Sequence, residues 1–147
     1  MPFKQIDVSR KPVVYREATA TGRIRLKKST VRLIKRGGLE KGDAVALASM
    51  TAIVAAKETP RIVALCHLLR IERVEPQVRV GADWVEVTVK VAAHERTGVE
   101  MEALTAVSVA LLNIWDVVKA YEKDSTGQYP TTSIESVRVK SKVKGTH

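Results

Sequence analysis

Four ionisable side chains interrupt an otherwise apolar stretch over residues 96–123. Glu100 and Glu102 lie near its start, whereas Asp116 and Lys119 lie near its end. On a helix, Asp116 and Lys119 would share one face, because residues three positions apart are about 60° apart around the axis. Ionisable groups on a largely apolar helix need either charged partners or a chemical role such as acid–base catalysis. Two structural ion pairs would explain the same pattern, so both interpretations remain open at this point.

The stretch has the features of one long helix. Thr97 fits an N-cap, with Glu100 three residues later as a capping box requires. Beyond its first turn the stretch contains no Gly or Pro, and its apolar residues run almost without interruption. We therefore expect a mostly buried helix over residues 96–123. Glu102 and Asp116, fourteen positions apart, would lie on one face within roughly 40°, separated by about 21 Å along the axis.

Composition and charge limit the class of protein. The 147 residues fit one domain, residues 1–147, with a sizeable core. One cysteine, Cys66, excludes an internal disulfide and suits a reducing cytosol, so we expect a cytoplasmic protein. The start lacks the pattern of a signal peptide, and the longest apolar run, residues 44–56, is too short to span a bilayer. The 25 basic and 16 acidic residues give a net charge of +9, which favours anionic partners without identifying them.

The first quarter of the chain is predicted to contain an irregular arm, a strand and a short helix. The arm covers residues 1–12, and the strand covers residues 15–26 with Gly22 as a bulge or bend. Ser29 would cap the helix, which a Gly-Gly pair ends. Residues 23–36 include seven Lys or Arg and no acid. We favour a solvated surface for this run over an anion-binding face.

A second helix is predicted from Ala44 to about Lys57. Asp43 is its expected N-cap, and Pro60 is expected to end it. The segment has almost no polar side, so we expect burial on most of its surface.

A strand is predicted next, over residues 61–71. Neighbouring side chains in a strand face opposite ways, so Cys66 and His67 could not share a metal there. With no second cysteine in the chain, a zinc site is not expected. A lone histidine in an apolar strand is usually structural.

A hairpin and a final strand complete the predicted sheet. The hairpin pairs residues 69–80 with residues 84–94, and Pro76 indicates an edge strand. A loop over residues 124–133 precedes a last strand and a basic tail, residues 140–147. The polar side of the hairpin would stay wet or meet another subunit; it carries Glu86, Thr88 and Lys90. The expected fold class is α+β: an antiparallel four-stranded sheet with helices packed on one face, as in a ferredoxin-like plait, within an oligomer.

Six sequence blocks resemble those of the MoaC family, the cyclic pyranopterin monophosphate synthases of molybdenum cofactor biosynthesis. In chain order they are DVSRKPVVYREA, KGDAVALA, IVAAKET, LCHLL, VEMEALTAVSVA and WDVVKA. The resemblance covers roughly residues 6–144. It implies a lyase that converts a cyclised dihydroguanosine triphosphate to cyclic pyranopterin monophosphate and releases diphosphate. A triphosphate calls for cationic donors, and ring opening and closure call for proton carriers that work near neutral pH.

The resemblance also implies which residues act. Catalysis falls on Lys41, Asp116 and Lys119, with Asp116 orienting and tuning Lys119. The substrate-binding residues that it implies are Arg16, Lys57, Leu65, Cys66, His67, Glu100, Met101, Glu102 and Lys140. No metal ligand or resident cofactor is implied, although a Mg²⁺ ion could accompany the substrate triphosphate. The mechanism requires the amines of Lys41 and Lys119 to lie close together, within one chain or across a subunit contact.

The chain departs from the family pattern in three places. Ala64 and Leu68 replace prolines that usually flank the Cys-His pair, so the loop around His67 would be less rigid. The tail lacks two central glycines, which removes the backbone freedom that suits close phosphate approach, although Lys140 still aligns. The loop over residues 124–133 is longer than usual.

The helix spacing suggests a shared site. One small substrate cannot contact both Glu102 and Asp116 of one chain across about 21 Å. A two-fold axis that pairs two such helices antiparallel, crossing near Val109, would bring them together from two chains; alternatively, Glu102 serves a separate cluster. The resemblance implies a homohexamer, a trimer of dimers with sites at the dimer interfaces, which agrees with shared sites.

Two alternatives belong to other classes. A nucleic-acid-binding module without catalysis would use residues 23–36 and the tail as a phosphate track. Against it, aromatic residues make up only 4% of the chain, so platforms for base stacking are scarce. An inactive structural relative would need a broken catalytic set, whereas Lys41, His67, Asp116 and Lys119 are all present.

Overall fold

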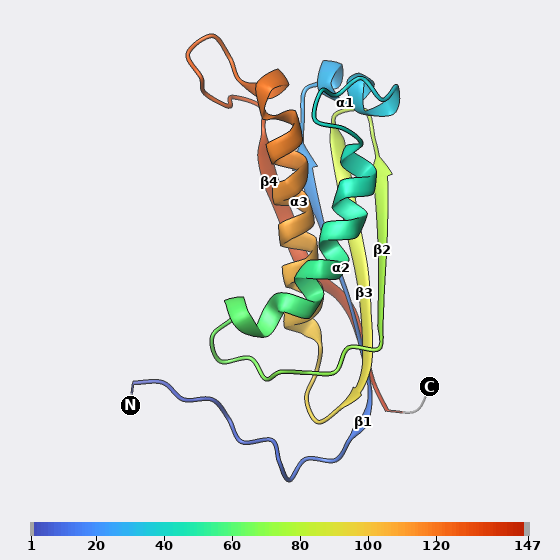
Figure 1. Cartoon of the computed structure of the whole chain (residues 1–147), viewed down its shortest axis with the longest axis vertical. Coiled ribbons are helices and arrows are strands. Elements are labelled where there is room, and N and C mark those ends of the chain that lie inside the picture. Colours follow the sequence, from blue (N-terminus) through green and yellow to red (C-terminus); the bar gives the residue numbers. More distant parts are fainter. Residues whose placement is uncertain (1, 146–147) are drawn as a thin grey trace.

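The computed structural model describes residues 2–145 of the chain (Figure 1). The first residue of the predicted arm and the last two residues of the predicted tail, 146 and 147, lie outside the described residues. The elements in chain order are β1 Val14–Arg25, α1 Lys28–Lys35, α2 Ala44–Ile62, β2 Arg73–Val80, β3 Trp84–Glu95, α3 Glu100–Glu122 and β4 Ser133–Lys144.

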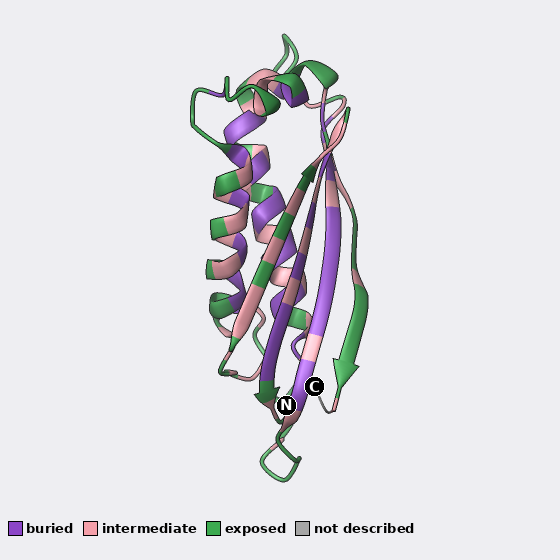
Figure 2. Cartoon of the chain, turned by 90° about the vertical axis from the view of Figure 1, so that its right-hand side faces the viewer, coloured by how far each residue is buried: buried purple, intermediate pink, exposed green. Residues whose placement is uncertain are grey.

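The four strands form one antiparallel sheet in the order β2-β3-β1-β4. Both long helices, α2 and α3, lie on the same side of this sheet (Figure 2). The α+β class with a four-stranded antiparallel sheet and helices on one face is therefore confirmed. Pro76 lies on the edge strand β2, as predicted, and the polar residues of β3 point away from the helices.

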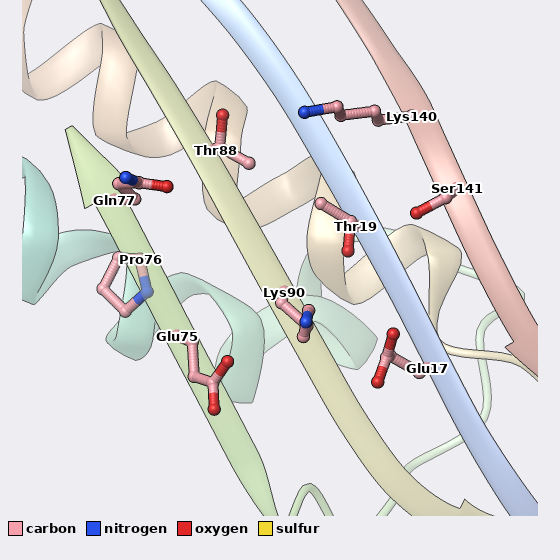
Figure 3. A pocket seen from close by; sticks show the side chains of 9 residues that line it. All are labelled: Glu17, Thr19, Glu75, Pro76, Gln77, Thr88, Lys90, Lys140 and Ser141. Atoms are coloured by element: carbon pink, nitrogen blue, oxygen red, sulfur yellow. The ribbon is translucent and has the colours of Figure 1, made fainter. Parts of the chain in front are cut away.

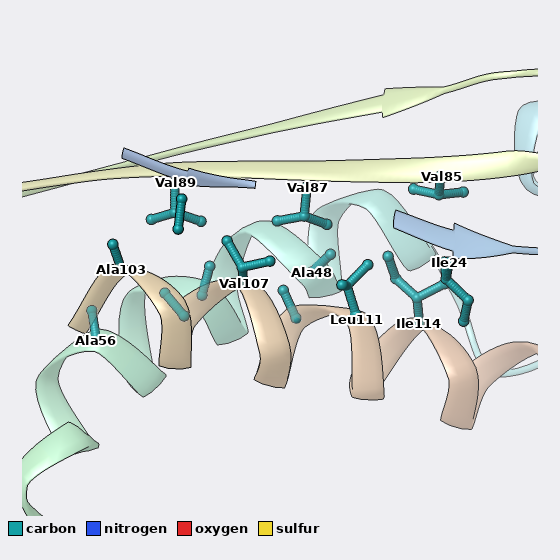
Figure 4. Packing of buried hydrophobic residues seen from close by; sticks show 14 of the residues in the cluster. Ile24, Ala48, Ala56, Val85, Val87, Val89, Ala103, Val107, Leu111 and Ile114 are labelled. Atoms are coloured by element: carbon teal, nitrogen blue, oxygen red, sulfur yellow. The ribbon is translucent and has the colours of Figure 1, made fainter. Parts of the chain in front are cut away.

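The core fills the space between the sheet and the two helices (Figure 4). Alternate valines of β3 meet branched side chains of α3, and α2 adds small alanines that let the two helices approach closely. The main contributors are Val85, Val87, Val89, Val107, Leu111, Ile114, Ala48, Ala52 and Ala56. By length and composition alone α3 could cross a membrane, but half of that stretch is buried inside the protein, as in a core helix.

Gly22 lies where β1 packs tightly against α3 and β4. The pairing of β1 with β4 shifts register between Thr21 and Arg23, so the predicted bulge is confirmed. A Cβ at position 22 would lie 2.9 Å from Val137 Cγ2 and 3.0 Å from the side chain of Leu111. Glycine is therefore required here by packing.

The predicted capping box of the long helix is wrong. Val99, rather than Thr97, occupies the N-cap position of α3, and it makes no side-chain capping bond. The Glu100 carboxylate instead accepts a hydrogen bond from Lys142 of β4 at 3.3 Å. An ion pair with the sheet therefore replaces the local bond that the sequence pattern favoured.

The predicted cap of the short helix is also wrong. Lys27, rather than Ser29, is the N-cap residue of α1 and has no side-chain capping bond. Its backbone N–H donates to the buried carboxylate of Glu122, 3.1 Å away. A residue from the far end of α3 thus satisfies a helix terminus that sequence patterns expect to be satisfied locally.

The second helix is longer and more exposed than predicted. Asp43 does cap it, accepting from the backbone of Val45 and Ala46, but Pro60 does not end it. Pro60 lies in the last turn, where little helix remains to be disrupted, and α2 continues to Ile62. The expectation of burial on most of its surface is wrong, because Met50 and Val54 are exposed.

No strand forms over residues 61–71. Residues 61 and 62 end α2, and residues 63–72 form a loop before β2. Arg70 of this loop bonds to the side chain of Glu95, and Cys66 bonds to the N-terminal arm. Of the loop's described residues, only Glu72, directly before β2, bonds to the backbone of β3. The predicted basic tail is likewise corrected, because β4 pairs with β1 as far as Lys144.

Candidate functional site

Most of the predicted site residues gather in two clusters near the two ends of α3. The C-terminal cluster consists of Lys41, Asp116 and Lys119, with Tyr121. The N-terminal cluster consists of Leu65, Cys66, His67, Glu100, Met101 and Glu102. Glu102 and Asp116 lie on the same continuous helix, so about 21 Å of helix axis separates the clusters within one protomer.

The carboxylate of Asp116 joins the two lysines of the C-terminal cluster. Lys119 Nζ lies 3.1 Å from Oδ1, one turn along α3. Lys41 Nζ, from the loop between α1 and α2, lies 3.5 Å from Oδ2 and donates to the Asp116 backbone oxygen at 3.3 Å. Both amines therefore sit on one carboxylate of one protomer, which is the proximity that the predicted mechanism requires.

This cluster is charged, accessible and next to a cavity. The hydrogen bond from Lys119 and its charge lower the pKa of Asp116, and the charge of Lys41 lowers it further. The three side chains are about half exposed, so these ion pairs contribute little to stability. They hold two ammonium groups beside a cavity of about 350 Å³ that Tyr121 also lines. Such an arrangement can bind a polyphosphate and exchange protons with it.

Tyr121 is a member of this cluster that sequence reasoning missed. Its hydroxyl oxygen accepts a hydrogen bond of 2.8 Å from the backbone N–H of Glu40. That bond fixes the turn that carries Lys41 against α3. No local sequence pattern reports such a contact, because 81 positions separate its partners.

Glu122 stabilises the C-terminal end of α3 through buried hydrogen bonds. Its carboxylate is fully buried. It accepts from the Lys27 backbone, from Thr30 Oγ1 at 2.5 Å and from Thr132 Oγ1 at 2.6 Å. An acid in the last turn of a helix opposes the helix dipole, and this was a sequence signal that Glu122 has a tertiary partner.

A second cavity, of about 320 Å³, lies at the N-terminal end of α3. The loop after α2 and the first turn of α3 supply the predicted lining. The N-terminal arm adds three lining residues that were not predicted, Ile6, Val8 and Lys11. The predicted substrate segment therefore faces a real concavity, although it lies on a loop and not on the expected strand.

Glu102 is the distinctive group of this cavity. It is only 2% exposed, and no other residue within 2–145 donates a hydrogen bond to it. Burial raises the pKa of Glu102, and the charge of Glu100 raises it further. Burial also raises the pKa of the Cys66 thiol, as does the charge of Glu102. A buried carboxyl group that receives no hydrogen bond from another described residue is suited to bind the donor groups of a ligand.

Three predicted residues lie outside both cavities. Arg16 donates to the backbone oxygens of Glu95 and Arg96, and so holds the segment that leads into α3. Lys57 is exposed on α2. Lys140 lies on the outer face of the sheet, where it lines a third cavity of about 400 Å³ with Thr19, Thr88 and other polar residues (Figure 3). One protomer thus does not bring the whole predicted set together.

The MoaC family model matches residues 5–145. The chain belongs to the MoaC family. Its MoaC relatives include proteins named "Probable cyclic pyranopterin monophosphate synthase" from three archaea. That of Thermococcus kodakarensis is 53% identical, covering 97% of this chain and 91% of the relative. That of Aeropyrum pernix is 54% identical, covering 95% and 96%, and that of Methanoregula boonei is 49% identical, covering 97% and 92%.

Within the described part of this MoaC chain, no three His, Cys, Asp or Glu residues are grouped so that they could hold a metal ion. The ionisable side chains of the two clusters are carboxyl groups, amines, a phenol, an imidazole and a thiol.

Proposed function

We propose that this MoaC family protein is a cyclic pyranopterin monophosphate synthase of molybdenum cofactor biosynthesis. Its substrate would be the cyclised dihydroguanosine triphosphate, 3′,8-cyclo-7,8-dihydro-GTP, and its products cyclic pyranopterin monophosphate and diphosphate. As a phosphorus–oxygen lyase it breaks the bond to diphosphate while a cyclic phosphate forms. The observation that carries the proposal is the Asp116 carboxylate holding two amines beside a cavity.

The amines of Lys41 and Lys119 are the proposed proton carriers. Ring opening and closure each need a proton to be removed from one atom and delivered to another. The lowered pKa of Asp116 keeps its carboxylate ionised at neutral pH, so it can orient both amines throughout the reaction. The same two amines offset the negative charge of the triphosphate. A Mg²⁺ ion, if the reaction uses one, would be ligated mainly by phosphate oxygens.

We also propose that two protomers complete each site. The outward face of α3 carries exposed Met101, Leu112 and Asp116, and α2 adds exposed Met50 and Val54. Exposed apolar side chains on adjacent helices favour burial against a partner. Antiparallel pairing of two α3 helices would place the N-terminal cluster of one beside the C-terminal cluster of the other.

The assembly would be a homohexamer built as a trimer of dimers, with sites at the dimer interfaces. The strand order and the one-sided helices support the ferredoxin-like plait for each protomer. In such an assembly, Lys140 and the third cavity of one protomer could lie near a site to which a neighbouring protomer contributes.

Anaerobic incubation with the cyclised substrate, followed by measurement of diphosphate release, tests the proposal. Lys119→Ala should lower kcat about 10³-fold, as expected for loss of a proton carrier. Lys123→Ala, an exposed lysine one turn along, should stay within about twofold. No turnover by the wild type, together with steeply salt-dependent binding of polynucleotide, would favour the nucleic-acid-binding alternative.

A further inference from the structure

The N-terminal arm, residues 2–12, is attached to the loop that carries His67. Gln5 Nε2 donates to the Cys66 backbone oxygen at 2.9 Å, and the Ile6 backbone oxygen lies 2.5 Å from Nε2 of His67. A carbonyl oxygen only accepts, so Nε2 of His67 must carry the hydrogen of this bond. The arm therefore leaves Nδ1 as the ring nitrogen that a ligand can contact.

Arg96 fixes the arm a second time, nearer to β1. Its Nη1 donates to the backbone oxygens of Lys11 at 2.7 Å and Ser9 at 3.2 Å. The arm is also folded locally, since the Lys11 N–H donates to the Val8 oxygen at 3.0 Å. These bonds define one path for residues 5–11 along the edge of the cavity.

Burial in the core does not explain why the arm takes this path. Ordering eleven residues costs conformational entropy, which burial of apolar side chains normally offsets. Phe3 and Ile6 are each 61% exposed, so the arm gains little in this way. The specific bonds to Cys66, His67 and Arg96 decide its position instead.

The arm changes the composition of the cavity at the N-terminal end of α3. Ile6 and Val8 form part of its wall, and Lys11 is the one lysine or arginine among the described residues that line it. The acidic side chains that line it are Glu100 and Glu102. Without Lys11 the cavity would repel the anionic parts of a nucleotide.

We infer that the N-terminal arm is part of the ligand site: it holds His67 in the Nε2–H form and places the Lys11 amine where it binds an oxygen of a nucleotide. Only the identity of the ligand rests on the proposed function. The attachment of the arm and its contribution to binding do not.

Two matched pairs of variants test the inference, with GTP as the probe and calorimetry as the measurement. Lys11→Met should weaken GTP binding about tenfold, as expected for one charge-assisted hydrogen bond. Lys4→Met removes the same charge from the same arm but outside the cavity, and it should change the Kd less than about twofold. The thermal midpoints of the two variants should be equal. A difference in GTP affinity between them would then not be due to a difference in stability.

Arg96→Ala should release the arm without touching the cavity. Hydrogen exchange of residues 2–12 should accelerate, and GTP binding should weaken about as much as in Lys11→Met. Arg61→Ala, which breaks only an exposed pair with Glu58, should do neither. Failure of the wild type to bind GTP, or equal binding by Lys11→Met and Lys4→Met, overturns the inference. Lys11-dependent GTP binding without turnover of the cyclised substrate supports the inference and overturns the proposed function.

Discussion

The two ends of α3 differ in how their charges are satisfied. At the C-terminal end, Asp116 is paired with Lys41 and Lys119 in the free protomer. At the N-terminal end, Glu102 is buried, and no other described residue donates a hydrogen bond to it. One end has its carboxylate paired with two amines without a ligand, whereas the other carries a buried carboxyl group that no cation of the described residues pairs and that a ligand or a second protomer could contact.

The supports of the two ends differ in the same way. Glu122 ties the C-terminal end to α1 through bonds that are buried or partly buried, and Tyr121 ties it to the turn before α2 through one exposed bond. The N-terminal end is held by an exposed loop and an exposed arm, with Leu68 84% accessible. The comparison indicates a more rigid half, to which the proposed function assigns the proton chemistry, and a more adaptable half, to which it assigns recognition of the substrate.

A large effect, close to that of Lys119→Ala, is expected from Asp116→Asn, which removes the charge that holds both amines. We expect kcat for diphosphate release to fall about 10²- to 10³-fold, with the fold intact because the side chain is exposed. Asp124→Asn, an exposed acid that shapes only its own loop, should remain near wild type. Equal activity of the two variants would remove Asp116 from the mechanism.

The pH dependence of the Asp116 ion pairs in the wild type also tests the C-terminal end of α3. The pKa of Asp116 is lowered from its ordinary value of 3.8, so its ion pairs form fully above that value. They should be lost only as the pH falls through the lowered pKa. When the titration of the Asp116 carboxyl group is followed by NMR, its midpoint in the wild type should therefore lie at a lower pH than its midpoint in a Lys119→Ala variant.

Glu122→Ala tests the rigidity of the C-terminal end. It leaves buried donors of Lys27, Thr30 and Thr132 without an acceptor, so we expect the free energy of unfolding to fall by about 3 kcal/mol. Urea denaturation measures the loss. The exposed Glu58→Ala variant is the control and should change stability by less than about 0.5 kcal/mol. A small effect of Glu122→Ala would mean that the two ends are equally adaptable.

Glu102→Gln tests the N-terminal end of α3 and should stabilise the protein while lowering its activity. Removing an unpaired buried charge should raise the free energy of unfolding by about 1 kcal/mol at pH 7. Because burial raises the pKa of Glu102 above 4.5, the charge penalty fades as the pH falls through that raised value. The advantage of Gln should therefore vanish near pH 4.

Glu100→Gln is the matched control for that prediction. It breaks the partly exposed pair with Lys142, so stability should change by less than about 0.5 kcal/mol and in the unfavourable direction. Destabilisation by Glu102→Gln at neutral pH would show that Glu102 has a partner in the assembled protein.

Local patterns predicted much of the fold. Alternating valines predicted the hairpin, Asp43 predicted the start of α2, and Gly22 predicted the bulge. Each of these features depends on neighbours in sequence. The strand expected over residues 61–71 failed because partners distant in sequence, including Glu95, hold that segment as a loop.

The candidate site was predictable to a smaller extent. Helical spacing alone brings Asp116 and Lys119 together, whereas Lys41 was identified only through the family resemblance. Tyr121 and Lys11 have no distinguishing pattern, because their positions follow from contacts between segments far apart in the chain.

Subunit mixing decides whether the two ends of α3 from two protomers form one site. When Lys119→Ala and Glu102→Gln proteins are unfolded together and reassembled, half of the dimers are mixed, and one of the two sites in each has both halves intact. Activity should return to about one quarter of wild type. Lys41→Ala mixed with Lys119→Ala should recover nothing, because both changes affect the same end. No recovery in the first mixture despite confirmed subunit exchange, or recovery in the second, would contradict a shared site.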